Sequence, residues 1–127
     1  MIIEARNLSK KVIFNDKEIT ILDDINLKVS SASSLAVIGP SGSGKSTLLG
    51  ILAGLDSPSS GEIYINQKPL HDLSEDARSK IRKDSVAFVF QNFELLSGLN
   101  ALENVMLPLE LKDKKMPEIL LKHILKK

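Results

Sequence analysis

The chain has 127 residues, of which 43% are hydrophobic, enough for a single domain with an apolar core. The 17 basic and 16 acidic residues give a net charge of +1, so no bulk positive field favours a nucleic-acid partner. No cysteine is present, which excludes disulfides and thiol chemistry, and the two histidines have no neighbours at metal-ligand spacing. Because no apolar run has the length of a membrane span and the N-terminus lacks a signal-peptide pattern, we expect a cytoplasmic protein.

The first 34 residues favour strands. Residues 2–8 and 18–29 are strand-like, and the turn-prone Asn15, Asp16 and Lys17 separate them. The second segment alternates apolar and polar residues until Leu22, Asp23 and Asp24 interrupt the pattern. A polar connection, residues 30–34, then leads into residues 35–38, a run of four apolar residues that predicts a buried strand.

A phosphate-binding loop follows this strand. It matches the pattern G-x-x-x-x-G-K-[ST] at every fixed position, and the residues from 45 to 55 after it are predicted to form a helix. Strand, loop and helix are the setting that this motif requires. A Gly- and Ser-rich surface loop that happens to precede a helix is the alternative. The expected nucleotide-binding residues are Gly39, Pro40, Ser41, Gly42, Ser43, Gly44, Lys45, Ser46 and Thr47.

The residue types of this loop suit a nucleoside triphosphate with Mg²⁺. Gly42 and Gly44 allow positive φ and a close approach of backbone N–H groups to an oxygen-rich ligand. The helix that follows adds its positive N-terminal end. Lys45 supplies a point charge for the β- and γ-phosphates, and Ser46 offers a hydroxyl to the metal.

The rest of the chain alternates between predicted strands and helices. We expect a strand at residues 62–66 after a loop, and then a helix at residues 73–83 with Ser74 as its N-cap. A buried strand is predicted at residues 86–90 and ends at Gln91. Residues 102–111 have helical periodicity that Pro108 must kink or end, and Pro117 begins a last predicted helix, residues 117–126.

The order of these segments resembles the N-terminal half of an ABC-transporter ATP-binding subunit, of the lipoprotein-releasing and macrolide-export (MacB-type) subfamily. The similarity is carried by residues 22–27, 48–56, 59–63, 88–96 and 100–105, in that order and spacing around the phosphate loop. The resemblance implies an α/β fold, with an incomplete RecA-like P-loop NTPase core and the antiparallel β subdomain of ABC ATPases. It also implies ATP and Mg²⁺ as cofactors.

Residue by residue, the resemblance implies catalytic roles for Lys45 and Gln91. Gln91 matches the family's Q-loop glutamine, whose side chain reaches Mg²⁺ or the attacking water, so Ser46 and Gln91 are the implied metal-contacting residues. Residues 91–96 are the implied contact with a transmembrane permease subunit. The resemblance also implies that two such domains, peripheral on the cytoplasmic face of the inner membrane, close as a homodimer around two ATPs and drive export or extraction of a substrate through the membrane partner.

Three departures from the family pattern affect these expectations. Val12 occupies the position where the family stacks an aromatic residue on adenine, which leaves base preference open although Phe14 lies two residues on. Ser33 and Ser34 replace a Gly-Glu turn. Residues 1–127 match only the N-terminal portion of one nucleotide-binding domain, and the signature loop, the Walker B strand and the switch histidine are absent from them. We therefore expect this chain alone to bind nucleotide without hydrolysing it, and to be marginally stable or self-associating.

Two other functional classes are open on the sequence alone. One is a catalytically silent, truncated nucleotide-binding remnant. The other is a P-loop kinase of small molecules, which needs arginines in a lid over the phosphates. Arg78 and Arg82 lie together on one predicted helix, where they look like part of an exposed charged face.

Overall fold

The computed structural model describes residues 2–89 and 96–111. The chain divides into two compact units, residues 1–87 and residues 88–127, and we describe each by itself. Gln91, the adjoining residues up to 95 and the predicted helix at 117–126 lie outside the described residues. In the described part of the chain, no helix is both long enough and apolar enough to cross a membrane.

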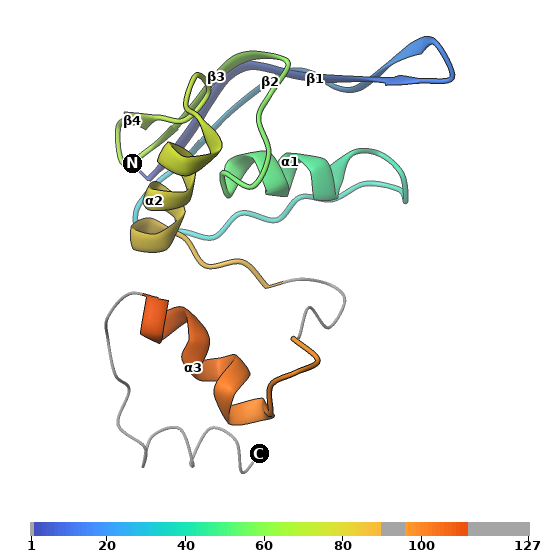
Figure 1. The fold of residues 1–127 in the computed structure, drawn as a ribbon. Coiled ribbons are helices and arrows are strands. Elements are labelled where there is room, and N and C mark those ends of the chain that lie inside the picture. Colours follow the sequence, from blue (N-terminus) through green and yellow to red (C-terminus); the bar gives the residue numbers. More distant parts are fainter. Residues whose placement is uncertain (1, 90–95, 112–127) are drawn as a thin grey trace. The chain divides into compact units, whose positions relative to one another are not determined.

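The first unit is built on an antiparallel sheet of four strands in the order β2-β1-β3-β4 (Figure 1). The strands are β1 (Ile3–Phe14), β2 (Lys17–Val29), β3 (Ser60–Ile65) and β4 (Lys68–Pro69). β1 and β2 form a long hairpin in which Phe14 pairs with Lys17. Asn15 and Asp16 make the connection at φ 50° and 60°, the left-handed conformation that a tight two-residue turn requires. The turn predicted from the sequence is therefore confirmed.

Irregular pairing in the middle of the hairpin explains the break in the alternating pattern. The register of β1 and β2 shifts between Ala5 and Lys11, and Asn7 and Asp24 adopt positive φ there. Asn7 donates its side-chain amide to Asp24 Oδ1 at 2.8 Å, and its backbone N–H bonds to Asn26 Oδ1 at 2.8 Å. Side chains thus satisfy backbone groups that the ladder leaves unpaired.

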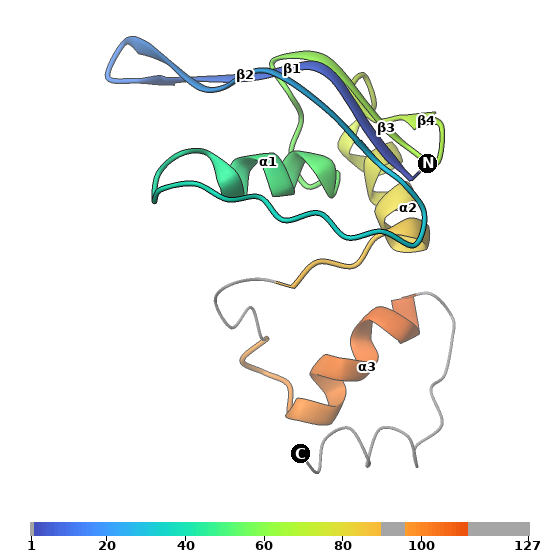
Figure 2. The same ribbon diagram turned by 180° about the vertical axis from the view of Figure 1, so that it is seen from behind.

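The core forms between the sheet and helix α1 (Lys45–Leu52), which lies along one face of the sheet (Figures 1 and 2). Helix α2 (Glu75–Ser85) adds Ile81 at its edge. Ser74 caps α2 by accepting a bond from Ala77 N at 3.3 Å, which confirms the predicted cap. The nine buried members of this cluster are Ala5, Leu8, Leu22, Leu48, Ile51, Leu52, Ile63, Ile65 and Leu70.

The two predicted core strands are wrong for the residues described. Residues 35–38 are irregular, with Leu35 54% and Ile38 92% exposed, and residues 86–89 are likewise not a strand. A strand needs neighbours for its N–H and C=O groups, and within residues 2–89 the sheet contains only β1 to β4. The antiparallel part of the predicted α/β fold is therefore present, and the parallel part is not formed in the described chain.

The second unit contains α3 (Ala101–Leu111). Asn100 and Glu103 form a reciprocal capping box at its start, with N–H bonds of 2.9 and 3.0 Å. The helix does not end at Pro108, one of the two outcomes predicted for it, and continues to Leu111.

Candidate functional site

The phosphate loop leads directly into α1. Gly44 is the N-cap of the helix at φ 91°, and Gly42 has φ 79°, so both glycines adopt the positive φ predicted for them. The loop closes on itself through Ser43 N, which donates to Pro40 O at 3.2 Å. The helix ends at Leu52, three residues before its predicted end.

Gly44 is also where the loop touches the sheet. A Cβ at this position would lie 2.9 Å from Ile21 O, 3.0 Å from Ile21 Cγ2 and 3.1 Å from Leu22 Cδ2. Only a residue without a side chain lets the N-terminus of α1 come so close to β2. The sequence motif signals the glycine but does not indicate that Ile21 and Leu22 are the residues it packs against.

The side chain of Lys45 reaches back across the phosphate loop and bonds to oxygens of the loop. Its Nζ donates to Gly39 O at 2.6 Å and Pro40 O at 2.7 Å, and lies 3.4 Å from Ser43 Oγ. None of the ion pairs found among the described residues involves Lys45, so its charge meets only neutral oxygens. The ammonium group and the first N–H groups of α1, which have no acceptor within the helix, therefore share one small region.

The chemistry of this region suits an oxygen-rich anion. The free N–H groups at the helix start and the lysine supply donors and positive charge, while Ser46 adds an exposed hydroxyl. Thr47 is half-buried at the first turn of α1. In residues 2–89 and 96–111 no cluster of three or more His, Cys, Asp or Glu residues could hold a metal by itself.

Val12 and Phe14, the two residues considered for contact with the nucleotide base, lie on the β1–β2 hairpin. Val12 is half-buried in β1 opposite Ile19, and Phe14 is 64% exposed next to the turn. The hairpin end and the phosphate loop lie at the same end of the first unit (Figures 1 and 2). Gln91, the remaining predicted site residue, lies outside the described residues.

The interpretation of Arg78 and Arg82 as an exposed face was wrong. Their side chains are only 12% and 21% exposed, because both bond to Glu75 and Arg82 also donates to Gly54 O. Arg82 is thereby held at the C-terminal end of α1. A sequence reading misses this arrangement because Gly54 and Arg82 are far apart along the chain.

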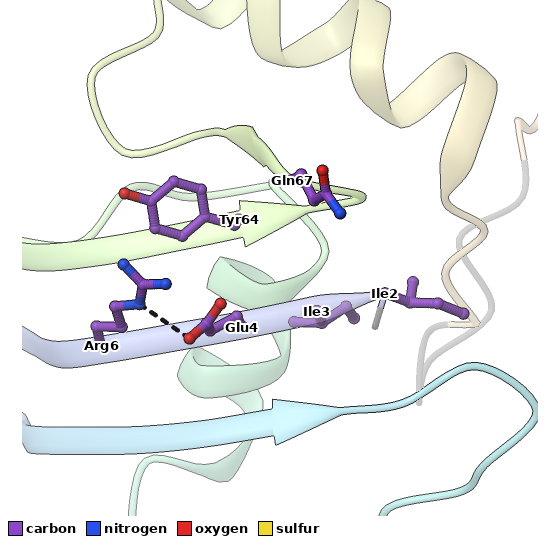
Figure 3. Close-up of a pocket in the computed structure, with 6 residues that line it drawn as sticks. All are labelled: Ile2, Ile3, Glu4, Arg6, Tyr64 and Gln67. Carbon is purple, nitrogen blue, oxygen red and sulfur yellow. Dashed lines mark hydrogen bonds and ion pairs between the residues drawn. The ribbon is translucent and has the colours of Figure 1, made fainter.

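A recess on the sheet is separate from the phosphate loop. It has a volume of about 220 Å³ and lies over β1 and β3 (Figure 3), lined by Ile2, Ile3, Glu4, Arg6, Tyr64 and Gln67. Glu4 Oε1 accepts from Arg6 at 2.9 Å and lies 3.2 Å from Lys28 Nζ, and these contacts, that with Arg6 first, lower the pKa of the carboxyl. The Arg6 guanidinium lies 5.1 Å from the centre of the Tyr64 ring. The polar groups of this recess thus bind one another and do not converge on a common point.

Comparisons with known proteins agree on one family. The family model for ABC transporters matches residues 22–127. The chain is 49% identical over 117 residues to the uncharacterized ABC transporter ATP-binding protein YbbA of Escherichia coli K12, covering 92% of the chain and 51% of YbbA. It is 41% identical over 120 residues to the lipoprotein-releasing system ATP-binding protein LolD of Colwellia psychrerythraea, covering 94% of the chain and 46% of LolD.

A solved structure is similar as well. It is the dimeric, post-hydrolysis state of the ATP-binding cassette MJ0796 of Methanocaldococcus jannaschii bound to ADP and Pi. The TM-score is 0.88 at 40% identity, and the match covers 98% of the chain and 54% of that structure. The chain therefore spans about half the length of the curated relatives and of the solved cassette.

Proposed function

The chain belongs to the ABC transporter family, and we propose that it binds Mg²⁺-ATP at residues 39–47 as part of the ATP-binding subunit of a transporter. The observation that carries the proposal is the position of Lys45. Its ammonium lies across a loop of positive-φ glycines at the N-terminus of α1, paired only with carbonyl and hydroxyl oxygens. Phosphate oxygens carry more negative charge than these oxygens and bond more strongly to an ammonium.

Each residue of the loop has a distinct task in this proposal. The backbone N–H groups of residues 42–47 bind the phosphates, and Lys45 turns from the loop carbonyls to the β- and γ-phosphates. Ser46 holds Mg²⁺ from one side, and Gln91 approaches the metal or the attacking water from the other. Bound Mg²⁺ neutralises charge on the phosphates during transfer.

Base recognition in this chain depends on apolar contact. Val12 provides a small apolar surface where an aromatic ring is expected in the family, and the exposed ring of Phe14 lies on the same strand, two residues further on. Without a ring at position 12 the base loses stacking of about 1 kcal/mol, so we propose a weak preference for ATP over GTP.

Hydrolysis and transport belong to the complete cassette in this proposal. Two cassettes close as a homodimer around two ATPs, and residues 91–96 contact a transmembrane permease at the cytoplasmic face of the inner membrane. Closure then drives export or extraction of a substrate. The 127 residues, which match about half of each relative, bind nucleotide and do not turn it over.

The small-molecule kinase alternative is disfavoured by a specific observation. Arg78 and Arg82, the arginines that a phosphate lid would need, bond to Glu75 of their own helix, and Arg82 also bonds to Gly54 O. The Arg82 guanidinium is therefore held at the far end of α1 from Lys45. Arg78 bonds to Glu75 through Nη2, while its Nε and Nη1 are buried without a hydrogen-bond partner among the described residues.

The proposal is tested by titrating the protein with Mg²⁺-ATP in a calorimeter. Lys45→Met should weaken binding at least about tenfold, because a charge-assisted hydrogen bond to phosphate is lost. Lys28→Met, which removes an exposed lysine from the sheet, is the matched control and should bind as the parent does. Equal affinities of the parent and the Lys45→Met variant would overturn the nucleotide site. Clear Lys45-dependent phosphate release by the 127 residues would overturn their proposed inactivity.

A further inference from the structure

We propose that Arg82 is a positioning residue for nucleotide binding, which fixes the C-terminal end of the helix whose N-terminal end forms the phosphate site. The inference rests on the proposed nucleotide site. The contact that motivates it is a hydrogen bond of 2.5 Å from Arg82 Nη1 to Gly54 O, just past the end of α1. Arg82 therefore connects α2 to the far end of the helix that Lys45 begins.

The end of α1 is built to receive this contact. Gly54 adopts φ 75°, and the chain turns back so that Gly54 N bonds to Ile51 O at 3.0 Å and Leu55 N to Gly50 O at 2.8 Å. This left-handed cap directs the Gly54 carbonyl away from the helix, where a donor from another element reaches it. A Cβ on Gly54 would lie 3.4 Å from Arg82 Cγ, so the stem of the arginine also packs against the cap.

Arg82 supplies a charge that α1 itself lacks. The last turn of α1 contains no basic residue, although the carbonyl groups at a helix C-terminus favour a cation. The guanidinium of Arg82 occupies that place from a different helix, with its side chain only 21% exposed. In the proposed complex α1 then has phosphates at its positive end and a guanidinium at its negative end.

Glu75 fixes the arginine in turn. Its Oε1 lies 2.5 Å from Arg82 Nη2, and its Oε2 lies 2.7 Å from Arg78 Nη2. Arg78 and Arg82 follow Glu75 by three and seven residues, so the three side chains share one face of α2. The same carboxylate therefore holds two arginines, of which only Arg82 is bonded to the end of α1 among the described residues.

The consequence for binding follows from the length of the helix. α1 has eight residues and is therefore about 12 Å long at 1.5 Å per residue. A tilt at its C-terminal end therefore also displaces its N-terminal end. Phosphate binding needs the N–H groups of the loop in one fixed arrangement, and freedom at the C-terminal end lowers the fraction of molecules that have it. Loss of the Arg82 contact should therefore weaken nucleotide binding although Arg82 does not touch the nucleotide.

The experiment compares Arg82→Met with Arg78→Met. Both variants remove a guanidinium that binds Glu75, but only Arg82→Met removes the bond to Gly54. We expect Arg82→Met to weaken Mg²⁺-ATP binding about two- to fivefold by calorimetry, and Arg78→Met to bind as the parent does. In the protein without nucleotide, the rate of amide hydrogen exchange at residues 42–48 should rise in Arg82→Met and stay unchanged in Arg78→Met.

One further variant, Arg82→Lys, makes the outcome decisive. Arg82→Lys keeps the charge but reaches one partner and not both, so its affinity should fall between those of the parent and Arg82→Met. If Arg82→Met does not fold, Arg82→Lys with unchanged affinity and unchanged exchange overturns the inference. If Lys45→Met loses binding while a folded Arg82→Met matches the parent in both measurements, the inference fails and the nucleotide site stands. If the parent itself does not bind, the proposed function fails, and exchange at residues 42–48 still decides whether Arg82 fixes the loop.

Discussion

Strand β3 and residues 35–38 lie in the same unit and both contain apolar residues, yet these residues have opposite surroundings. β3 lies beside β1 with Ile63 and Ile65 each 1% exposed, whereas Leu35 is 54% and Ile38 92% exposed. The difference lies in their neighbours. A two-residue turn connects β1 to β2, and β3 pairs with the other edge of β1. Both strands that pair with β1 therefore lie within residues 2–69. A parallel strand instead needs partners brought back by crossovers of a dozen or more residues each.

The comparison is tested most strongly by truncating one isoleucine in each region. Ile63→Ala should lower the free energy of unfolding by about 2–5 kcal/mol, because a fully buried side chain leaves a cavity between the sheet and α1. Ile38→Ala should change it by less than about 0.5 kcal/mol, because the side chain is already in solvent. Urea unfolding of both variants measures the two values, and equal losses would mean that Ile38 is buried in solution.

Glycines give a second contrast. Gly61 has φ 87°, and a Cβ there would lie 2.2 Å from Asn7 O, where the pairing of β1 and β3 shifts in register. Gly61→Ala should cost about 2–3 kcal/mol, since a positive φ is strained and the clash is with backbone. Gly42 has a similar φ of 79° with nothing within 4 Å, so Gly42→Ala should cost only the strain, about 1 kcal/mol. Thermal unfolding distinguishes them, and equal shifts would show that backbone strain alone decides.

A smaller effect is expected at the start of α2. Ser74→Ala removes the acceptor for Ala77 N, and should cost about 0.5–1 kcal/mol because the bond is long at 3.3 Å. Ser74→Asp, which keeps a cap and adds negative charge at the helix start, should retain the parent's stability. A loss in Ser74→Asp as large as that in Ser74→Ala would contradict the capping role.

The smallest effect concerns pH. The hydrogen bond from Arg82, and with it the bond from Arg78, lowers the pKa of Glu75 from an ordinary value of 4.5, against the opposing effect of burial. A lowered folded-state pKa contributes stability that is present above pH 4.5 and is lost as the pH falls through the lowered value. Glu75→Gln should therefore flatten the decline in melting temperature below pH 4.5, and Arg82→Met should flatten it in part. An acid decline identical in the parent and Glu75→Gln would contradict the pairing.

Features encoded by neighbouring residues could be predicted from the sequence. Asn15 and Asp16 mark the turn, Ser74 caps the helix that follows it, and the glycines of the phosphate loop adopt the positive φ expected of them. Each of these depends on the conformational preference of a single residue or on a side chain bonding within three residues.

Features that depend on distant partners could not be predicted. Residues 35–38 have the composition of a buried strand, but composition does not supply the neighbouring strands. Arg82 has the spacing of a solvated helix face, because nothing in its surroundings along the chain indicates that Gly54 O is its acceptor. The same limit applies to Ile21, whose carbonyl packs against Gly44 across the sheet–helix boundary.

The bonds from Lys45 to Gly39 O and Pro40 O have a consequence for how tightly the loop can hold an anion. Protein oxygens already surround the Lys45 ammonium, so a phosphate that binds replaces these oxygens with its own. The measured affinity then reports the difference between two sets of contacts and not the full strength of a lysine–phosphate bond. Before the anion binds, the bonds from the ammonium to these carbonyl oxygens hold the loop in its curved form, so the loop backbone has little left to reorganise.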